Sequence, residues 1–301
     1  MTKIKVLSLF DGISGCRQAL KEMDIDCSYY SSEIDKYAIQ VSKANHPDII
    51  QIGDVKGVLI EDGYIFHNQN NDPMQNGGSF KADVDLLIGG FPCQSFSIAG
   101  NQKGFGDERG QLFFEAIRIL EQVKPKYFLF ENVASMSKAN QDIISEKLGV
   151  EPIEINSRLV TYNQRKRLYW TNISNIEQPH DLKLDKKDII QTNYYGTIKV
   201  LKDKTRIVVE SKEMHSLTAR YTDLNGSSRP MIILNKEAIG KPFDSKKVGT
   251  DYRMLTVNEC CSLQGFPQDY CSPVSNSQGY KALGNSFTVP VIKHILKRLN
   301  D

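Results

Sequence analysis

Residues 85–97 read D-L-L-I-G-G-F-P-C-Q-S-F-S, and the rest of the chain is organised around them. Residues 84–88 form a short apolar run, which is typical of a buried parallel strand. Gly89 and Gly90 end this run, and Pro92 fixes one backbone angle just before the thiol of Cys93. Because α/β sheets bind their ligands beyond the carboxyl ends of their strands, this stretch predicts an α/β fold with a cysteine at such an end.

The residues that follow favour a chemical role for Cys93. Taken alone, a strand-end cysteine is more often a small buried side chain. Here, however, residues 101–113 read N-Q-K-G-F-G-D-E-R-G-Q-L-F, a polar segment with glycines and both charge signs. It leads into an amphipathic helix that carries Leu112, Phe113, Ala116, Ile117 and Leu120. A thiol beside a long polar loop indicates covalent catalysis beneath a lid.

The complete string closely resembles the catalytic loop of the DNA (cytosine-5)-methyltransferases. It reads G-G-F-P-C-Q-S-F-S-x-A-G from residue 89 and G-x-x-D-x-R-G-x-L-F from residue 104. The resemblance implies that Cys93 adds to C6 of a cytosine, and it places Pro92 beside the cofactor.

The beginning of the chain predicts a nucleotide-binding βαβ unit. Residues 4–10 have the pattern of a buried strand, and the glycine turn at residues 11–15 leads into a helix at residues 16–22. Glu33 follows about twenty residues later, after a second strand, where such units place the acid that binds ribose hydroxyls. Asp54 follows a third strand, and its carboxylate can accept from an exocyclic amine. The glycine pattern is shorter than G-x-G-x-x-G, so a simple βα turn is the alternative.

The same residues are similar to the S-adenosylmethionine site of this family, which begins L-F-D-G-I-S-G at residue 9. The resemblance implies that Phe10 packs on the adenine and that Ile34 covers its other face. It also implies that Glu33 holds the ribose and that Asp54 meets the adenine amine. The loop residues assigned to this site are Asp11, Gly12, Ser14 and Gly15.

Two further polar clusters adjoin apolar strands. Glu131 begins an E-N-V triplet after the strand at residues 127–130, where a lone glutamate would more often cap a helix. The triplet resembles the family motif whose acid gives a hydrogen bond or a proton to N3 of cytosine. Arg165 and Arg167, two residues apart on an extended segment, are expected to point the same way, toward an anion or a base oxygen. The family has glutamine where Asn163 stands, and the resemblance places Arg167 nearest the cytosine oxygen.

The second half of the chain has a different pattern. Residues 172–251 contain short strands interrupted by Gly, Asn, Lys and Asp, which predicts a small, mostly β insertion. By resemblance, residues 172–272 form the target recognition domain, and residues 1–171 and 273–301 form the catalytic and cofactor-binding domain. Thr256 and Glu259 predict a capped helix. Asn285 and Ser286, in a G-N-S string, resemble the segment that completes the methionine end of the cofactor site.

Composition excludes several classes of protein. The 301 residues, of which 40% are hydrophobic, suffice for a large domain and a small one. No apolar run approaches the roughly 18 residues of a membrane span, and the polar stretch at residues 64–81 is predicted to be a surface excursion. Six cysteines without a C-x-x-C pair indicate a reduced, cytoplasmic protein that binds no metal. The net charge of +2 does not itself indicate nucleic acid, and each basic cluster alone is more often a solvated face.

We therefore expect a doubly wound, Rossmann-like α/β methyltransferase domain that carries a smaller, mostly β target recognition domain. The resemblance implies that it transfers a methyl group from S-adenosyl-L-methionine to C5 of a flipped cytosine in a specific double-stranded DNA sequence, as a monomer. The short spacing between E-N-V and the arginines also resembles the animal de novo DNA methyltransferases. One alternative is an RNA cytosine-5 methyltransferase, but the members that act on transfer RNA carry a Cys-Phe-Thr triplet that this chain lacks. The other is a non-catalytic regulatory paralogue, which would typically lack the thiol or the acid.

Overall fold

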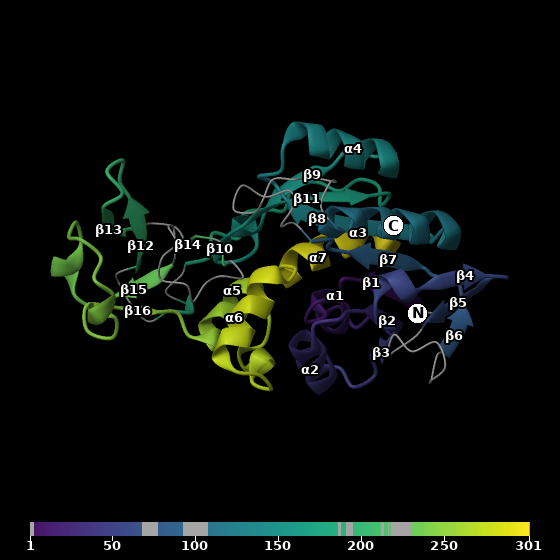
Figure 1. Cartoon of the computed structure of the whole chain (residues 1–301), viewed down its shortest axis with the longest axis horizontal. Helices are drawn as coiled ribbons and strands as arrows, with labels where there is room; N and C mark the ends of the chain where they lie inside the picture. The colour runs from purple at the N-terminus through teal and green to yellow at the C-terminus, as the bar shows by residue number, and fades with distance from the viewer. Residues whose placement is uncertain are drawn as a thin grey trace. The chain divides into compact units, whose positions relative to one another are not determined.

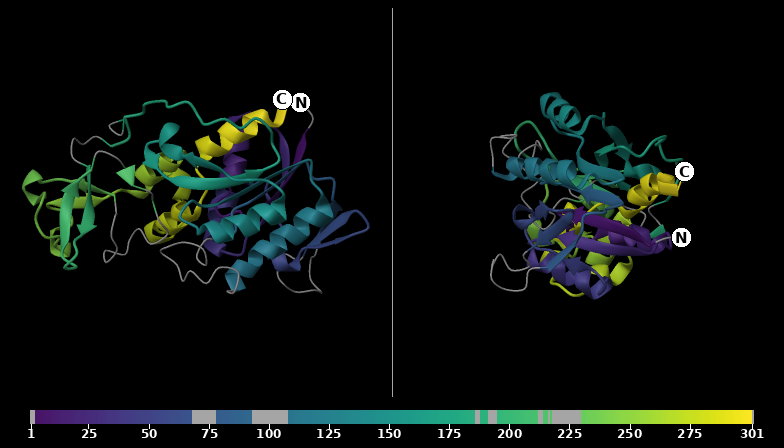
Figure 2. Two further views of the ribbon diagram at one scale, coloured as in Figure 1. Left: turned by 90° about the horizontal axis from the view of Figure 1, so that it is seen from above. Right: turned by 90° about the vertical axis from the view of Figure 1, so that its right-hand side faces the viewer.

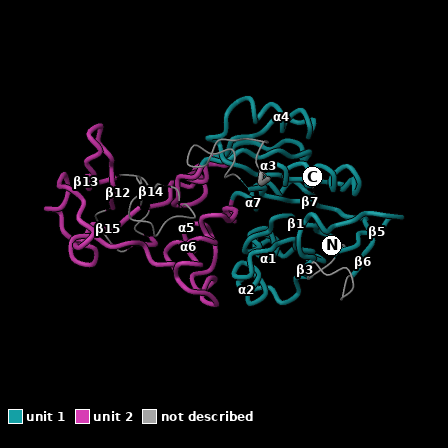
Figure 3. Tube along the Cα trace, in the orientation of Figure 1, with its two compact units in different colours: residues 1–155, 166–178, 291–301 teal, residues 156–165, 179–290 magenta. Residues whose placement is uncertain are grey.

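The computed structural model describes residues 3–67, 78–92, 108–185, 188–190, 195–211, 214–215, 217 and 230–300. Residues 93–107, which include Cys93, lie outside this part of the chain. The chain divides into two compact units (Figure 3). Unit 1 comprises residues 1–155, 166–178 and 291–301, and unit 2 comprises residues 156–165 and 179–290.

Unit 1 is built on a seven-stranded sheet in the order β3-β2-β1-β7-β8-β11-β9 (Figure 1). Strand β1 pairs in parallel with β2 on one side and with β7 on the other, so the strand order reverses at β1. Strand β11 runs antiparallel to β8. The predicted doubly wound α/β fold is thereby confirmed. The strands are β1 (Ile4–Leu9), β2 (Cys27–Ser32), β3 (Ile50–Gln51), β7 (Leu86–Gly89), β8 (Tyr127–Val133), β9 (Ile153–Asn156) and β11 (Lys166–Thr171).

Helices lie between β1 and β2, between β2 and β3, between β7 and β8 and between β8 and β9 along the chain. Helix α7 crosses from unit 2 into unit 1, where Lys293 forms an ion pair with Glu22 of α1 at 2.8 Å. Helix α7 is α-helical as far as Leu296, and Lys297–Asn300 continue it as a 3₁₀ turn. The helices are α1 (Gly15–Glu22), α2 (Lys36–Asn45), α3 (Glu108–Val123), α4 (Lys138–Leu148) and α7 (Val289–Leu296). None of the helices in the described residues has the length and apolarity needed to cross a bilayer.

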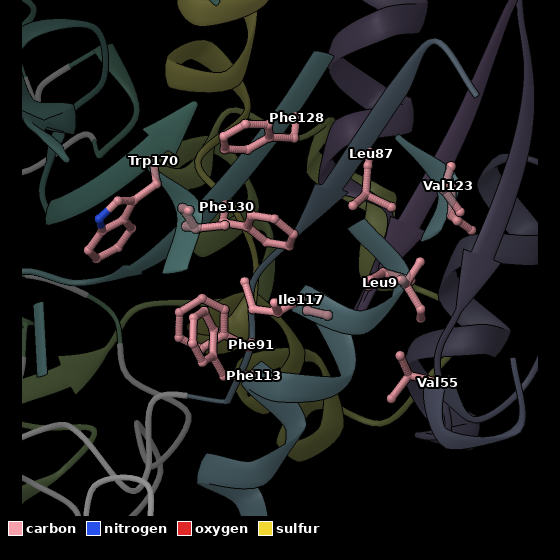
Figure 4. Close-up of a cluster of buried hydrophobic side chains, with 14 of the residues drawn as sticks. Leu9, Val55, Leu87, Phe91, Phe113, Ile117, Val123, Phe128, Phe130 and Trp170 are labelled. Atoms are coloured by element: carbon pink, nitrogen blue, oxygen red, sulfur yellow. The ribbon is translucent and has the colours of Figure 1, made fainter. Parts of the chain in front are cut away.

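The core of unit 1 follows from the two-residue period of its strands. Alternate side chains of a strand face the same side of the sheet, and Leu9, Leu87 and Phe130 share one buried cluster with Phe113 and Ile117 of α3 (Figure 4). Each such side chain contributes roughly 1.5–3 kcal/mol when it is fully buried. Helix α3 begins at Glu108 and buries Phe113, as the amphipathic pattern predicts. This core holds fixed the strand ends that carry the predicted site.

The prediction for residues 64–81 was wrong at both ends of the stretch. Strands β4 (Leu59–Glu61), β5 (Tyr64–His67) and β6 (Gly78–Lys81) form a three-stranded antiparallel sheet. Ile65 is fully buried, and Phe80 stacks on Tyr30 with ring centroids 3.6 Å apart. The polar residues between these strands, 68–77, lie outside the described part of the chain. The few apolar residues at each end therefore decide the local structure.

Unit 2 contains a four-stranded antiparallel sheet in the order β13-β12-β15-β16, whose strands are labelled in Figure 1. These strands lie in the green part of the ribbon in Figure 2. Its core includes Ile198, Val208, Met231, Ile233 and Tyr252. This sheet confirms the smaller β region that the sequence predicts. The strands of unit 2 are β10 (Asn163–Gln164), β12 (Tyr195–Val200), β13 (Arg206–Glu210), β14 (Met214–His215), β15 (Met231–Ile233) and β16 (Tyr252–Met254).

The helices of unit 2 are α5 (Val257–Gln264) and α6 (Asn276–Asn285), and the predicted capping box of α5 is present. The Thr256 hydroxyl accepts from the Glu259 N–H at 3.1 Å, and the Glu259 carboxylate accepts from the Thr256 N–H at 2.7 Å. The helix ends at Gly265, whose φ of 80° is left-handed. A Cβ at Gly265 would lie 2.3 Å from the Cδ of Pro290, so only glycine fits at this position.

Candidate active site

The carboxyl ends of β1, β2 and β3 bring the predicted cofactor residues to one edge of the parallel sheet. Phe10 follows β1, Glu33 follows β2, and Asp54 follows β3 by three residues. Since β2 and β3 lie on the same side of β1, these residues are carried by neighbouring strands. This is the edge at which open α/β sheets bind ligands.

Glu33 connects the loops that follow β1 and β2. Its Oε2 accepts from the Gly12 N–H at 2.7 Å, and its Oε1 accepts from the N–H groups of Ile34 and Asp35, each at 2.8 Å. Burial raises the pKa of Glu33 above its ordinary value, and these three N–H groups oppose that rise. A carboxylate offers about four acceptor sites, so Glu33 can still bind about one further donor.

The loop from Phe10 to Ser14 has an unusual backbone. Phe10, Gly12 and Ser14 have φ values of 55°, 59° and 59°, all left-handed. A Cβ built on Gly12 would meet nothing within 4 Å, so the loop faces open space at that residue. Ile34, beside Glu33, is an apolar side chain that is 71% exposed. An open loop next to an uncovered apolar side chain fits a flat, partly apolar ligand.

The other predicted members of the cofactor set differ in exposure. Asp54 is half-buried, and its Oδ1 accepts from the Lys56 N–H at 3.0 Å, which caps the short 3₁₀ turn η1 (Val55–Gly57). Asp11, Ser14 and Gly15 are buried, and the Asp11 carboxylate is surrounded by hydroxyl groups. Pro92 is half-buried and is the last described residue before Cys93.

Glu131 and Arg167 form an ion pair in unit 1. The Nε of Arg167 lies 2.8 Å from Oε1 of Glu131, and the two side chains are only 15% and 12% exposed. The E-N-V triplet does not follow the end of a strand, as the sequence suggested, but lies inside β8. The parallel pairing with β7 stops at Phe130, whereas the antiparallel pairing with β11 continues to Val133. The acid therefore emerges where the parallel part of the sheet ends.

Asn132 is a further candidate residue of this site, and the sequence assigned it no role of its own. It is 1% exposed, and its Nδ2 donates to the backbone carbonyl of Phe91 at 3.1 Å. Its Oδ1 accepts from the N–H of Val133 at 2.8 Å. The sequence feature that could have indicated such a role is the amide of Asn132, which lies between an acid and an apolar residue in the E-N-V triplet. Asn132 thus ties the Glu131 strand to the main chain just before Pro92 and Cys93.

The two arginines bind different groups, because the extended segment is interrupted between β10 and β11 at Arg165. Arg165 belongs to unit 2 and is 3% exposed. It donates to the backbone carbonyls of Leu217, Gly284 and Ser286 at 3.0, 3.1 and 3.0 Å. Asn285 ends helix α6, and Ser286 is buried with its hydroxyl on the carbonyl of Leu283. Arg165 therefore fixes the G-N-S segment from within unit 2.

The described residues contain no group of three or more His, Cys, Asp or Glu side chains placed to hold a metal ion.

Unit 1 combines a doubly wound sheet with carboxylates at its ligand-binding edge and an acid–arginine pair beside the strand that leads to a cysteine. These features define the class of Rossmann-like α/β enzymes that bind a nucleotide-containing cofactor.

Comparisons with known proteins identify the family. The model of the C-5 cytosine-specific DNA methylases matches residues 4–151 and 141–301. The Type II methyltransferase M1.ScrFI of Lactococcus lactis subsp. cremoris is 30% identical over 99% of this chain and 78% of its own length. The Type II methyltransferase M.HhaI of Haemophilus parahaemolyticus is 29% identical over 98% of this chain and 94% of its own length.

Solved structures confirm the fold. The methyltransferase EhMeth of Entamoeba histolytica superimposes with a TM-score of 0.70 at 19% identity, over 99% of this chain and 98% of its own. The Dnmt2 methyltransferase of S. pombe gives a TM-score of 0.64 at 19% identity and covers all of both chains. The chain belongs to the C-5 cytosine-specific DNA methylase family. It is therefore an enzyme that methylates C5 of cytosine in DNA, with a methyl donor of the S-adenosylmethionine type.

Proposed function

We propose that this chain methylates a cytosine within a specific double-stranded DNA sequence, through a covalent bond between Cys93 and C6 of a flipped base. The observation that carries the proposal is the Glu131–Arg167 ion pair on β8 and β11, joined through Asn132 to the main chain before Cys93. The curated relatives are Type II methyltransferases, which favours a modification enzyme with one recognition sequence.

The residues at the sheet edge suit S-adenosyl-L-methionine, which supplies an electrophilic methyl group when it is bound. Glu33 has acceptor capacity left for a ribose hydroxyl, and Ile34 and Phe10 offer apolar surface for the adenine. The Oδ2 of Asp54 accepts no hydrogen bond from the described residues, which leaves it for the adenine amine. Asn285 and Ser286 are proposed for the methionine end.

The protein residues solve the problem that C5 of cytosine is a weak nucleophile. The Cys93 thiolate forms a bond to C6, while Glu131 donates a hydrogen bond or a proton to N3. The contact at N3 withdraws electrons from the ring and so favours addition of the thiolate at C6. The addition in turn makes C5 an enamine-like, electron-rich carbon that can attack the methyl group. After methylation, loss of the C5 proton and release of the thiolate restore the ring. Arg167 keeps Glu131 in place and is proposed to contact the cytosine oxygen.

Target recognition is proposed to lie in residues 172–272, and the chemistry in residues 1–171 and 273–301. Base-edge contacts specify a sequence, whereas phosphate contacts mainly position the protein. The polar and basic side chains of this segment are therefore the candidates for groove contacts. Exchanging it with the segment of a relative of different specificity should transfer the recognised sequence. An active chimera that still methylates the original sequence would place recognition elsewhere.

The test is covalent trapping. A DNA duplex with 5-fluorocytosine at the target should form a stable adduct with the protein when S-adenosylmethionine is present, because the C5 proton has been replaced. The adduct should disappear in Cys93→Ala. The matching RNA should form none. An adduct that persists in Cys93→Ala would refute the proposed nucleophile, and an adduct with RNA alone would refute the proposed substrate.

A further inference from the structure

Asp11 lies in the loop between β1 and α1, and its carboxylate accepts four hydrogen bonds. The residue is 4% exposed. Its Oδ1 accepts from the Ser8 hydroxyl at 2.6 Å and from the Tyr29 hydroxyl at 2.7 Å. Its Oδ2 accepts from the Ser31 hydroxyl at 2.8 Å and from the Ser14 hydroxyl. These four hydroxyls fill the roughly four acceptor sites of a carboxylate, so none is left for a ligand.

The hydroxyl partners of Asp11 come from three parts of unit 1. Ser8 lies on β1, Tyr29 and Ser31 lie on β2, and Ser14 directly precedes α1. All four are buried, at 1% exposure or less. Ser14 occupies the position before the helix at which a serine normally caps it, yet its side chain makes no cap hydrogen bond. The Ser14 hydroxyl donates to the Asp11 carboxylate instead.

This arrangement holds a loop whose backbone conformation is unfavourable. Left-handed backbone conformations cost non-glycine residues roughly 1–2 kcal/mol each, and both Phe10 and Ser14 adopt one. The Asp11 carboxylate fixes the side chain of Ser14, and the Asp11 carbonyl accepts from the Ser14 N–H at 3.0 Å. On the other side of the loop, the Ser42 hydroxyl of α2 donates to the carbonyl of Gly12 at 3.2 Å.

The Phe10–Ser14 loop also donates a hydrogen bond to Glu33, the acid proposed to bind the ribose. The Gly12 N–H donates to Oε2 of Glu33, so a shift of the loop would move or release one of the three hydrogen bonds that orient this carboxylate. We propose that Asp11 is a positioning residue for the cofactor, which acts through the Phe10–Ser14 loop and Glu33 without touching the cofactor itself. The inference rests on the proposed S-adenosylmethionine site and assigns Asp11 a different role from its neighbours Phe10 and Gly12.

Calorimetric titration of S-adenosylmethionine into Asp11→Asn tests this assignment. The amide keeps the shape of the side chain but presents a donor to two of the four hydroxyls. The Kd is expected to rise at least tenfold. In the cofactor-free protein, amide hydrogen exchange at Gly12 and Ser14 is expected to quicken. Ser14→Ala removes the loop's own bond to the carboxylate, so it should show both effects and serves as the test if Asp11→Asn does not fold.

Ser145→Ala is the matched control, because Ser145 is a buried hydroxyl of the same unit that accepts from Nε1 of Trp170 at 3.0 Å. It should lower the melting temperature and leave the Kd within twofold. If Asp11→Asn and Ser14→Ala behave like this control, Asp11 is only structural and the inference is wrong. Weaker binding without faster exchange in the cofactor-free protein would indicate direct contact and also overturn it. Wild-type protein that binds no S-adenosylmethionine would instead refute the proposed cofactor.

Discussion

The side-chain amide of Asn132 donates to the backbone carbonyl of Phe91, two residues before Cys93. Phe91 is itself held by the core, with its ring 5.0 Å from that of Phe113 and 6.4 Å from that of Phe130. The main chain before the proposed nucleophile is thus held by apolar packing and by a buried hydrogen bond. The packing holds the ring, and the hydrogen bond sets the orientation of the peptide group.

We expect Asn132→Ala to slow covalent trapping on the 5-fluorocytosine duplex by about ten- to a hundredfold, because small misplacements of a reacting group cost about that much. The Kd for S-adenosylmethionine should stay within twofold. Asn172→Ala is the control, since Asn172 also bonds main-chain groups of unit 1, the N–H of Phe128 and the carbonyl of Lys126. If both variants trap DNA equally well, Asn132 has no positioning role.

Arg165 and Arg167 should respond differently to replacement by lysine. Lysine cannot reach three carbonyls in the fixed geometry of a guanidinium, so Arg165→Lys leaves buried acceptors unsatisfied at about 1–3 kcal/mol each. Its main effect should be a lower melting temperature. Arg167→Lys should melt nearly as the wild type does and should mainly lower kcat, through its pairing with Glu131. Thermal denaturation and single-turnover methylation measure the two effects, and a reversed pattern would contradict the assignment.

Sequence patterns predicted the parts of this molecule that local chemistry determines. The strand and glycine turn before α1, the capping box at Thr256 and the buried face of α3 each follow from a few adjacent residues. Contacts between residues that are far apart in the sequence could not be predicted in this way. Nothing near Glu131 reveals that β11 extends its strand, and nothing near Arg165 reveals the carbonyls of Gly284 and Ser286.

The acids at the sheet edge show the same limit. The strand-end pattern suggests that Glu33 and Asp54 serve the cofactor alone and that replacing either would leave stability unchanged. The structure gives Glu33 three backbone N–H partners from two loops, so it also supports the fold. Its carboxylate is proposed to serve both purposes, because those loops meet at the edge where the ligand is expected.

Glu33→Ala is therefore expected to lower the stability of the cofactor-free protein by about 1 kcal/mol, because three N–H groups that are exposed or only partly buried lose their carboxylate acceptor. Glu33→Gln, which keeps one acceptor oxygen, should lose less stability but still bind S-adenosylmethionine more weakly. Asp54→Ala loses only the cap of a short 3₁₀ turn and should cost less than Glu33→Ala. Denaturant unfolding and calorimetric titration separate the two effects. Normal binding by Glu33→Gln would refute its role toward the cofactor.

Low pH is expected to lower the stability of the protein because of His46, which lies at the end of α2 and is 2% exposed. Burial, together with the charges of Arg17 and Lys21, lowers the pKa of His46 to about 4. An unfolded histidine titrates near 6.5, so between pH 6.5 and 4 the unfolded chain binds more protons and the stability falls as the pH falls. The shift bounds this loss at about 3 kcal/mol. Urea unfolding at pH 7 and pH 4.5 should show it, and His46→Asn should flatten the difference. An equally steep dependence in that variant would assign the acid sensitivity to other groups.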